Sequence, residues 1–161
     1  MRLTIDNTIA VKWVIEEAGS LRARSYLPVV KAEEVLTPYF LSAPALIELE
    51  FHNTLSKKLK NGVINRQQFS LGKLLGFREV QIDPVDAELV REAADYSIGG
   101  RVWLANFEGR IPLDAALPFS IYDCLYMAHA RQQGNALLTA DKEQARIAQA
   151  IGIPVEFVPT E

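Results

Sequence analysis

The chain has 161 residues, of which 49% are hydrophobic and 23% are charged, with a formal net charge of −3. This composition predicts one folded domain over residues 1–161 and excludes intrinsic disorder. A single cysteine excludes a disulfide framework and a multi-cysteine zinc site, and two histidines argue against a histidine-rich metal site. The acidic balance argues against a generally basic nucleic-acid-binding surface but not against acids that bind metal.

Short apolar runs and stretches of helical periodicity alternate along the chain. Residues 3–5 predict a strand that ends at Asp6, and a helix follows from about Thr8. The elements predicted next are a helix over 21–35, a short strand at 41–42, a helix from 44 to about 60, a helix over 66–75 and a strand over 79–82. Asn61-Gly62 predicts a left-handed end for the long helix.

The second half continues this alternation after an irregular region. It predicts a helix from 83 to about 94, an irregular insertion near 96–118, a helix from 120 to 134, a strand over 136–139, a helix over 141–150 and a strand near 155–158. We therefore expect an α/β fold with a central, mostly parallel sheet flanked by helices. Such sheets carry their functional site at the carboxyl ends of the strands.

Three acids lie at helix starts or strand ends, where capping is an ordinary structural explanation. Asp6 and Asp141 each precede a predicted helix. Asp123 stands three residues after Ser120, and this capping-box spacing predicts that its carboxylate closes back on the Ser120 amide. Taken singly, capping is the favoured interpretation for Asp123 and Asp141.

Glu50 is harder to explain as a structural residue. On a helical wheel it falls in a stripe with Leu46 and Ile47. An acid in an apolar stripe must be paired, protonated or bound to a cation, because an isolated buried charge is very unfavourable. A salt bridge at the edge of the core, for example with Lys57, is the structural alternative.

Together, Asp6, Glu50, Asp123 and Asp141 predict a site at one edge of the sheet. Oxygen ligands of this kind suit Mg²⁺ or Mn²⁺. The chemistry that requires them is phosphodiester hydrolysis, in which one ion activates a water and a second stabilises the leaving oxygen. The sequence leaves open whether one or two ions bind.

The remaining chemically active side chains are assigned structural roles. His52 and His129 are expected to be polar helix residues, and Cys124 a small buried residue. A basic run follows Glu50 and consists of Lys57, Lys58, Lys60 and Arg66. A solvated helix end is the favoured interpretation of this run, and contact with a phosphate backbone is the functional one.

Four segments resemble the motifs of PIN-domain nucleases, especially VapC-type toxins. They are Thr4-Ile-Asp-Asn-Thr8 with Ala10-Val-Lys-Trp13; Ala43-Pro-Ala-Leu46 with Glu50, Asn53 and Leu55; Ser120-Ile-Tyr-Asp-Cys-Leu-Tyr126 with Ala128 and Ala130; and Leu138-Thr-Ala-Asp141. Their order and spacing match over most of the chain. The resemblance implies a PIN-like α/β/α sandwich with the activity of an Mg²⁺- or Mn²⁺-dependent endoribonuclease.

The resemblance also assigns roles to individual residues. It places metal ligands at Asp6, Glu50, Asp123 and Asp141, and supporting groups at Thr8, Asn53 and Thr139. For VapC-type members it implies a homodimer, inhibited by an antitoxin whose tail enters the acidic groove. The cysteine and histidine content fits a reducing, cytoplasmic location. No membrane association is expected, because the chain has neither a signal peptide nor an apolar run of membrane-spanning length.

Two features depart from the family pattern. Asn7 stands where many members have alanine, and the link before the third motif is longer than usual. That link contains Arg101, Trp103, Phe107 and Arg110. Packing of an insertion on the domain is its favoured interpretation, and contact with RNA or a partner is the functional one.

Two other functions compete with a toxin-type endoribonuclease. One is a catalytically inactive PIN-fold binding module that acts through a protein partner, and the four intact acids argue against it. The other is a receiver-like phospho-acceptor domain, which requires a lysine after a late strand. The late strands lead instead into Thr139-Ala-Asp141 and Val158-Pro159, so this interpretation is disfavoured.

Overall fold

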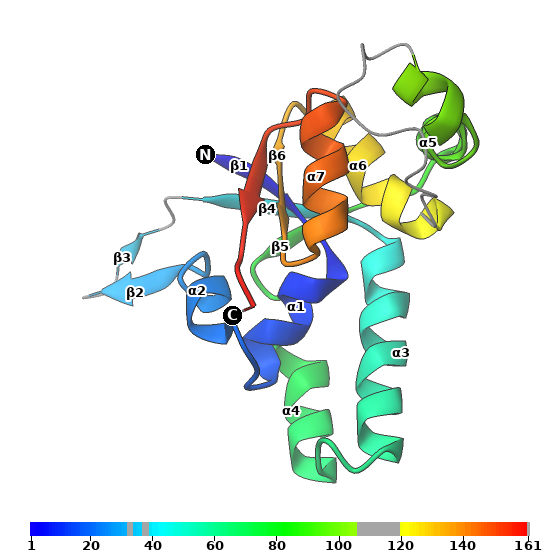
Figure 1. Ribbon diagram of the computed structural model, residues 1–161. Coiled ribbons are helices and arrows are strands. Elements are labelled where there is room, and N and C mark those ends of the chain that lie inside the picture. The colour runs from blue at the N-terminus through cyan, green and yellow to red at the C-terminus, as the bar shows by residue number, and fades with distance from the viewer. Residues whose placement is uncertain (32–33, 37–38, 106–119, 161) are drawn as a thin grey trace.

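The computed structural model describes residues 1–31, 34–36, 39–105 and 120–160, and a parallel sheet lies at its centre (Figure 1). The strands of this sheet are β1 (Arg2–Ile5), β4 (Phe40–Pro44), β5 (Val80–Asp83), β6 (Ala136–Thr139) and β7 (Val155–Phe157). Their order is β5-β4-β1-β6-β7, and every neighbouring pair is parallel. The predicted α/β class is thus confirmed.

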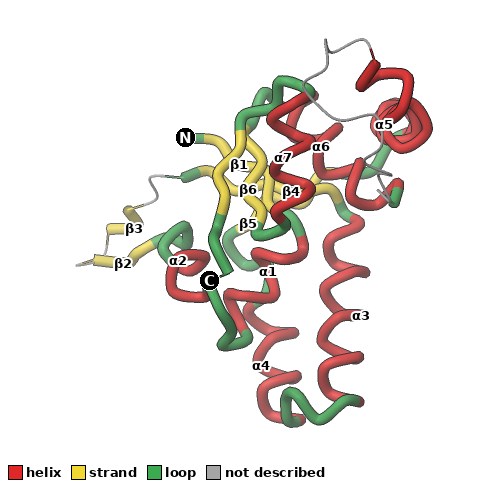
Figure 2. Tube along the Cα trace, in the orientation of Figure 1, coloured by secondary structure: helices red, strands yellow, loops and turns green. Residues whose placement is uncertain are grey.

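Helices surround this sheet and extend beyond one end of it (Figure 2). They are α1 (Asn7–Val14), α2 (Ser20–Arg24), α3 (Leu46–Lys60), α4 (Arg66–Leu75), α5 (Ala87–Ala105), α6 (Ile121–Gln133) and α7 (Lys142–Ala150). Helix α6 packs on β1, β4 and β6, and α7 packs on β6 and β7. Helices α3 and α4 lie side by side and project away from the sheet (Figures 1 and 2).

Local sequence signals explain where several helices begin and end. A capping box between Asn65 and Gln68 starts α4, because each side chain accepts a hydrogen bond from the other residue's backbone N–H. Gly62 has φ +71°, so α3 ends in the left-handed conformation that Asn61-Gly62 predicted. These boundaries agree with the sequence analysis because they depend on neighbouring residues.

The helix predicted over 21–35 is wrong. It ends at Arg24, and the chain then forms strands β2 (Val29–Lys31) and β3 (Glu34–Leu36), which pair antiparallel outside the main sheet. Pro28 explains the difference, because it lacks a backbone donor and restricts the residue before it. The valines that follow favour a strand.

Helix α5 is longer than predicted. It continues through Gly99-Gly100 to Ala105, so the first part of the region expected to be irregular is helical. The helix packs along α6, and tertiary packing of this kind overrides the weak helix propensity of glycine. The rest of the predicted insertion, 106–118, lies outside the described residues. Within the described part of the chain, no helix has the length and apolar character needed to cross a membrane.

Candidate active site

The carboxyl ends of the central strands bring Asp6 and Asp141 to one edge of the sheet. Asp6 follows β1 and Asp141 follows β6, and these two strands are neighbours. Asp123 lies in the first turn of α6, and Glu50 in the second turn of α3, which follows β4. The topology therefore carries all four predicted acids toward the same edge, as the sequence analysis expected.

Asp6 is a buried carboxylate with a full set of local donors. The residue is only 3% exposed. Its Oδ1 accepts hydrogen bonds from Thr8 Oγ1 at 2.6 Å and from Ile9 N at 3.1 Å. Thr139 Oγ1 lies 2.6 Å from Oδ2. Burial nevertheless raises the pKa of Asp6 to about 6, and the charge of Asp141 adds to this increase against the effect of the donors.

Asp141 combines a structural role with proximity to Asp6. Its Oδ1 accepts hydrogen bonds from the backbone N–H of Glu143 at 2.8 Å and of Gln144 at 2.9 Å, and so caps α7. Capping, the structural interpretation of this residue, is thus confirmed. The cap involves one carboxylate oxygen, and the other is available for a further ligand because the residue is exposed.

Glu50 and Asp123 form a second acidic pair. Burial raises the pKa of the half-buried Glu50, and the nearby charge of Asp123 raises it further. Asp123 lies in the first turn of α6, where Ser120 Oγ donates to its Oδ2 at 2.8 Å and accepts from its backbone N at 3.3 Å. The Ser120 hydroxyl thus caps α6 and contacts the Asp123 carboxylate, whereas the predicted contact of that carboxylate with the Ser120 amide is not among the hydrogen bonds of the described residues.

Tyr126 holds Glu50 and was not identified as a site residue from the sequence. Its hydroxyl donates a short hydrogen bond of 2.5 Å to Glu50 Oε2. Burial and the surrounding charges of Glu50, Asp6 and Asp123 all raise the pKa of Tyr126, so the phenol keeps its proton and remains a donor. The available signal was its position three residues after Asp123, which places both on one face of α6.

Gln144 links the helix starts that carry Asp123 and Asp141 and was also missed. It is 2% exposed, its Nε2 donates to the Asp123 carbonyl at 3.1 Å, and its Oε1 lies 2.9 Å from Thr139 Oγ1. The Thr139 hydroxyl has one proton for two acceptors, Asp6 and Gln144. The Thr139 contact lowers the pKa of Asp6, in opposition to burial, which identifies the hydroxyl as a donor to the carboxylate.

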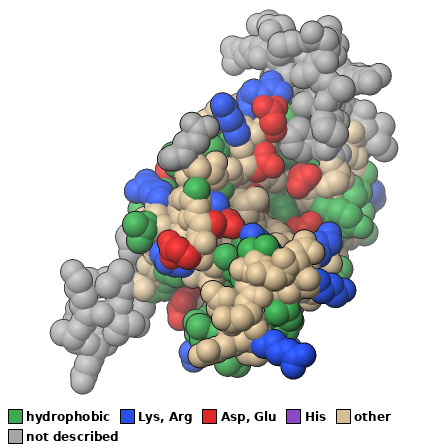
Figure 3. Space-filling model, turned by 60° about the horizontal axis from the view of Figure 1, so that its bottom comes forward, with side chains coloured by type: hydrophobic (Ala, Val, Ile, Leu, Met, Phe, Trp, Pro, Cys, Tyr) green, Lys and Arg blue, Asp and Glu red, His purple; other side chains and the backbone are tan. Residues whose placement is uncertain are grey.

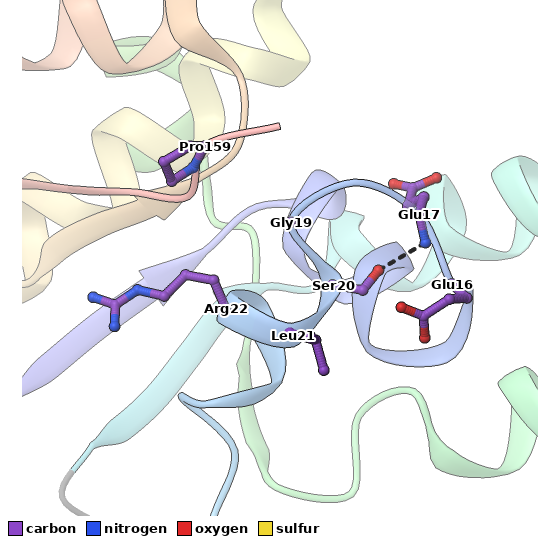
Figure 4. Close-up of a pocket in the computed structure, with 7 residues that line it drawn as sticks. All are labelled: Glu16, Glu17, Gly19, Ser20, Leu21, Arg22 and Pro159. Atoms are coloured by element: carbon purple, nitrogen blue, oxygen red, sulfur yellow. Dashed lines mark hydrogen bonds between the residues drawn. The ribbon is translucent and has the colours of Figure 1, made fainter. Parts of the chain in front are cut away.

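The supporting residues expected from the family resemblance are also near the acids. Thr8 and Thr139 contact the Asp6 carboxylate, while Asn53 lies beside Glu50 in a cleft of about 350 Å³ that is also lined by Leu46, Leu49 and Tyr122. Acidic side chains also gather around a hollow on the face that Figure 3 shows, with basic side chains toward its edge. A separate pocket over the loop between α1 and α2 contains none of the four acids (Figure 4).

The other titratable candidates are structural. His129 is 2% exposed, with Nδ1 2.9 Å from Thr4 Oγ1 and Nε2 3.0 Å from Asp83 Oδ2. It is therefore a buried, hydrogen-bonded residue of α6, and burial lowers its pKa. Cys124 is buried as predicted, and burial raises the pKa of its thiol to about 12. His52 Nδ1 lies 2.6 Å from the Glu48 carbonyl on α3.

The donor set fits a divalent cation, although no preassembled cage is present. Among the described residues, no three carboxylate, histidine or cysteine side chains are close enough to surround one ion. None of the ion pairs within these residues involves Asp6, Glu50, Asp123 or Asp141. The salt bridge between Glu50 and Lys57, which was the structural alternative for Glu50, is therefore not formed among the described residues. Mg²⁺ keeps several waters and needs only one or two carboxylates, so each acidic pair meets this requirement.

Comparison with known proteins identifies the family. A family model of the PIN domain matches residues 4–150, and the chain therefore belongs to the PIN domain family. This confirms the resemblance of the four sequence motifs. No curated protein matches the chain in sequence.

Solved structures share the fold at low sequence identity. VapBC2 from Rickettsia felis, bound to a DNA fragment from the promoter, has a TM-score of 0.62 with 14% identity and 98% coverage of both chains. VapC20 from Mycobacterium tuberculosis, a sarcin-ricin loop cleaving toxin, has a TM-score of 0.56 with 15% identity over 94% of this chain and 95% of that one. FitAcB from Neisseria gonorrhoeae has a TM-score of 0.55 with 13% identity over 95% of each chain.

Proposed function

We propose that the chain is an Mg²⁺- or Mn²⁺-dependent endoribonuclease of the VapC type, the toxin of a toxin–antitoxin pair. One observation carries this proposal: the buried Asp6 lies beside Asp141 and has no cationic side chain among its described contacts. Two neighbouring acids at the carboxyl edge of a parallel sheet require a positive charge when both are ionised. A divalent ion supplies that charge.

The four acids divide the work of holding metal in this proposal. Asp6 and Asp141 form one pair of ligands, and Glu50 and Asp123 form the other, directly or through water. A bound divalent ion neutralises phosphate charge and activates a water for hydrolysis. The protein's own contribution is orientation, because the hydroxyls of neighbouring residues fix the carboxylates before the ion binds. These hydroxyls belong to Thr8, Thr139 and Tyr126.

A protein partner is part of the proposal. The similar structures include the VapBC2 complex and FitAcB, which supports an antitoxin for this chain. Helix α4 also presents large apolar side chains to solvent, since Leu71 is 52% exposed and Leu74 is 72% exposed. Exposed apolar side chains in a group are typical of contact surfaces, either with an antitoxin or within a homodimer. A cytoplasmic location is also part of the proposal, supported by the single cysteine of the chain.

A nuclease assay tests the proposed reaction. Purified protein is incubated with single-stranded RNA in Mg²⁺, in Mn²⁺ and in chelator, and Asp6→Asn and Asp123→Asn are compared with the exposed control Asp95→Asn. We expect metal-dependent cleavage by the parent and the control, and a loss of at least 100-fold in the other two. Activity that is absent from the parent, or equal in all variants, refutes the mechanism. The first outcome favours a binding module of the same fold.

A further inference from the structure

A polar pocket adjoins the acidic site on the side of α1 and α3. It has a volume of about 250 Å³ and is lined by Asn7, Thr8, Val11, Lys12, Glu17, Thr54, Lys58, Ala140 and Thr160. Thr8 belongs to both regions, because it lines the pocket while its hydroxyl donates to Asp6 at 2.6 Å. A group in this pocket is therefore one side chain away from the buried acid of the proposed metal site.

Two lysines and one glutamate give this pocket a net positive charge. Glu17 lies between them, with Oε1 2.9 Å from Lys12 Nζ and Oε2 3.0 Å from Lys58 Nζ. Burial alone raises the pKa of Glu17, but the hydrogen bonds and charges of the two lysines lower it overall, so the acid is ionised. The three side chains then sum to one positive charge in a protein whose net charge is −3.

Lys58 is the lysine that is available to a ligand. Lys12 is 5% exposed and donates both to Glu17 and to the Ala18 carbonyl at 2.7 Å. The side chain of Lys58 is 27% exposed, and within the described parts of the chain it donates to Glu17 alone. An ammonium group has three N–H donors, so two of those on Lys58 remain for another acceptor.

The loop that holds Glu17 is fixed from both sides. Ser20 Oγ accepts from the Glu17 backbone N at 2.9 Å (Figure 4). It also donates to the Ile15 carbonyl at 2.9 Å. Gly19 has φ +83°, and a Cβ there would lie 2.5 Å from the Pro159 carbonyl oxygen, so the C-terminal segment packs directly on this loop. Glu17 thus holds the Lys58 ammonium at a defined place before any ligand binds.

We propose that Lys58, held by Glu17 beside Thr8, binds a backbone phosphate of the RNA next to the phosphate that is cleaved. This inference rests on the proposed function and identifies how that site holds its substrate. Acids alone repel RNA, and a fixed cation beside them adds affinity and sets the register of the strand. The other lysines of α3, Lys57 and Lys60, are exposed and do not line the pocket.

Salt-dependent RNA binding tests the subsite separately from cleavage. The Asp6→Asn protein is used as the parent. Its affinity for a fluorescein-labelled single-stranded RNA is measured by anisotropy between roughly 50 and 200 mM salt, a range over which affinity depends strongly on the number of phosphate contacts. Adding Lys58→Met should reduce the slope of log K against log salt by about 0.7 and weaken binding about fivefold at about 0.1 M salt. Lys57→Met is the matched control and should retain the parental slope.

An opposite change separates phosphate binding from a structural salt bridge. Glu17→Gln removes the negative charge that opposes a phosphate but keeps a side-chain oxygen that can accept from Lys58 Nζ, so Lys58 stays in the pocket and we expect tighter RNA binding. If the salt bridge is purely structural, Lys58→Met and Glu17→Gln should both weaken RNA binding, and both should lower the Tm. Parental binding with unchanged slopes in Lys58→Met contradicts the subsite alone, and so does weaker binding in Glu17→Gln. A parent that binds no RNA in chelator or in Mg²⁺ contradicts both the subsite and the proposed function.

Discussion

Asp6→Asn is expected to stabilise the metal-free protein near neutral pH. In the folded chain the pKa of Asp6 is about 6, against a reference value of 3.8. Because this folded-state pKa is raised, the associated stability is present below the unfolded pKa and is lost as the pH rises through 6. The difference of about 2 units corresponds to about 3 kcal/mol of unfolding free energy. Asparagine does not titrate, so its variant avoids this loss.

Thermal unfolding in chelator at pH 4.5 and pH 7.5 measures the effect. Because pH 4.5 lies above the unfolded-state pKa, the loss over this interval is about 2 kcal/mol. For a domain of this size, we expect the Tm difference between the variant and wild type to increase by about 4–8 °C at the higher pH. Saturating Mg²⁺ should then raise the Tm of wild type but not that of Asp6→Asn. Asp95→Asn, at an exposed position, controls for net charge. A Tm difference that does not change with pH would refute the reasoning that burial penalises the Asp6 charge.

Three further changes test the support around the acids. Tyr126→Phe removes the hydrogen bond to Glu50, and we expect Mn²⁺ affinity to fall about tenfold in a calorimetric titration while the fold persists. Gln144→Ala should lower the unfolding free energy in urea by about 1–3 kcal/mol because it leaves buried partners unpaired, whereas Gln149→Ala, exposed on the same helix, should have little effect. Burial lowers the pKa of His129 in the folded protein, so the unfolding free energy should decrease as the pH falls below the pKa of His129 in the unfolded chain. His129→Gln should make this decrease smaller when urea unfolding is compared between about pH 7 and 5.

The parts of the fold that were predictable are those encoded in short stretches of sequence. The strand before Asp6, the helix over 66–75 and the strand over 136–139 follow from local periodicity and caps. The helix predicted over 21–35 is wrong beyond Arg24, because Pro28 cannot continue a helix and the residues after it form strands. The extent of α5 depends on packing against α6, which no local pattern around Gly99 reveals.

The sheet edge at which the acids lie and the two threonines beside Asp6 could be predicted, but the contacts of Tyr126 and Gln144 could not. Asp6 and Asp141 stand at strand ends, and a parallel sheet brings such ends together. Tyr126 approaches Glu50 across 76 positions of sequence, so their hydrogen bond exists only in the tertiary structure. The pocket at Lys58 has the same origin, because Glu17, in the loop after α1, meets Lys58 of α3 only when α1 packs against α3.

Direct binding of a divalent ion tests the central claim that these acids form a metal site. Mn²⁺ is titrated calorimetrically at pH 7.5 into wild type, Asp6→Asn, Glu50→Gln and the control Asp95→Asn. The proposed site predicts binding to wild type and to the control, with affinity at least tenfold weaker when Asp6 or Glu50 is replaced. Equal Mn²⁺ affinity in all four proteins, or no binding to wild type, would contradict it.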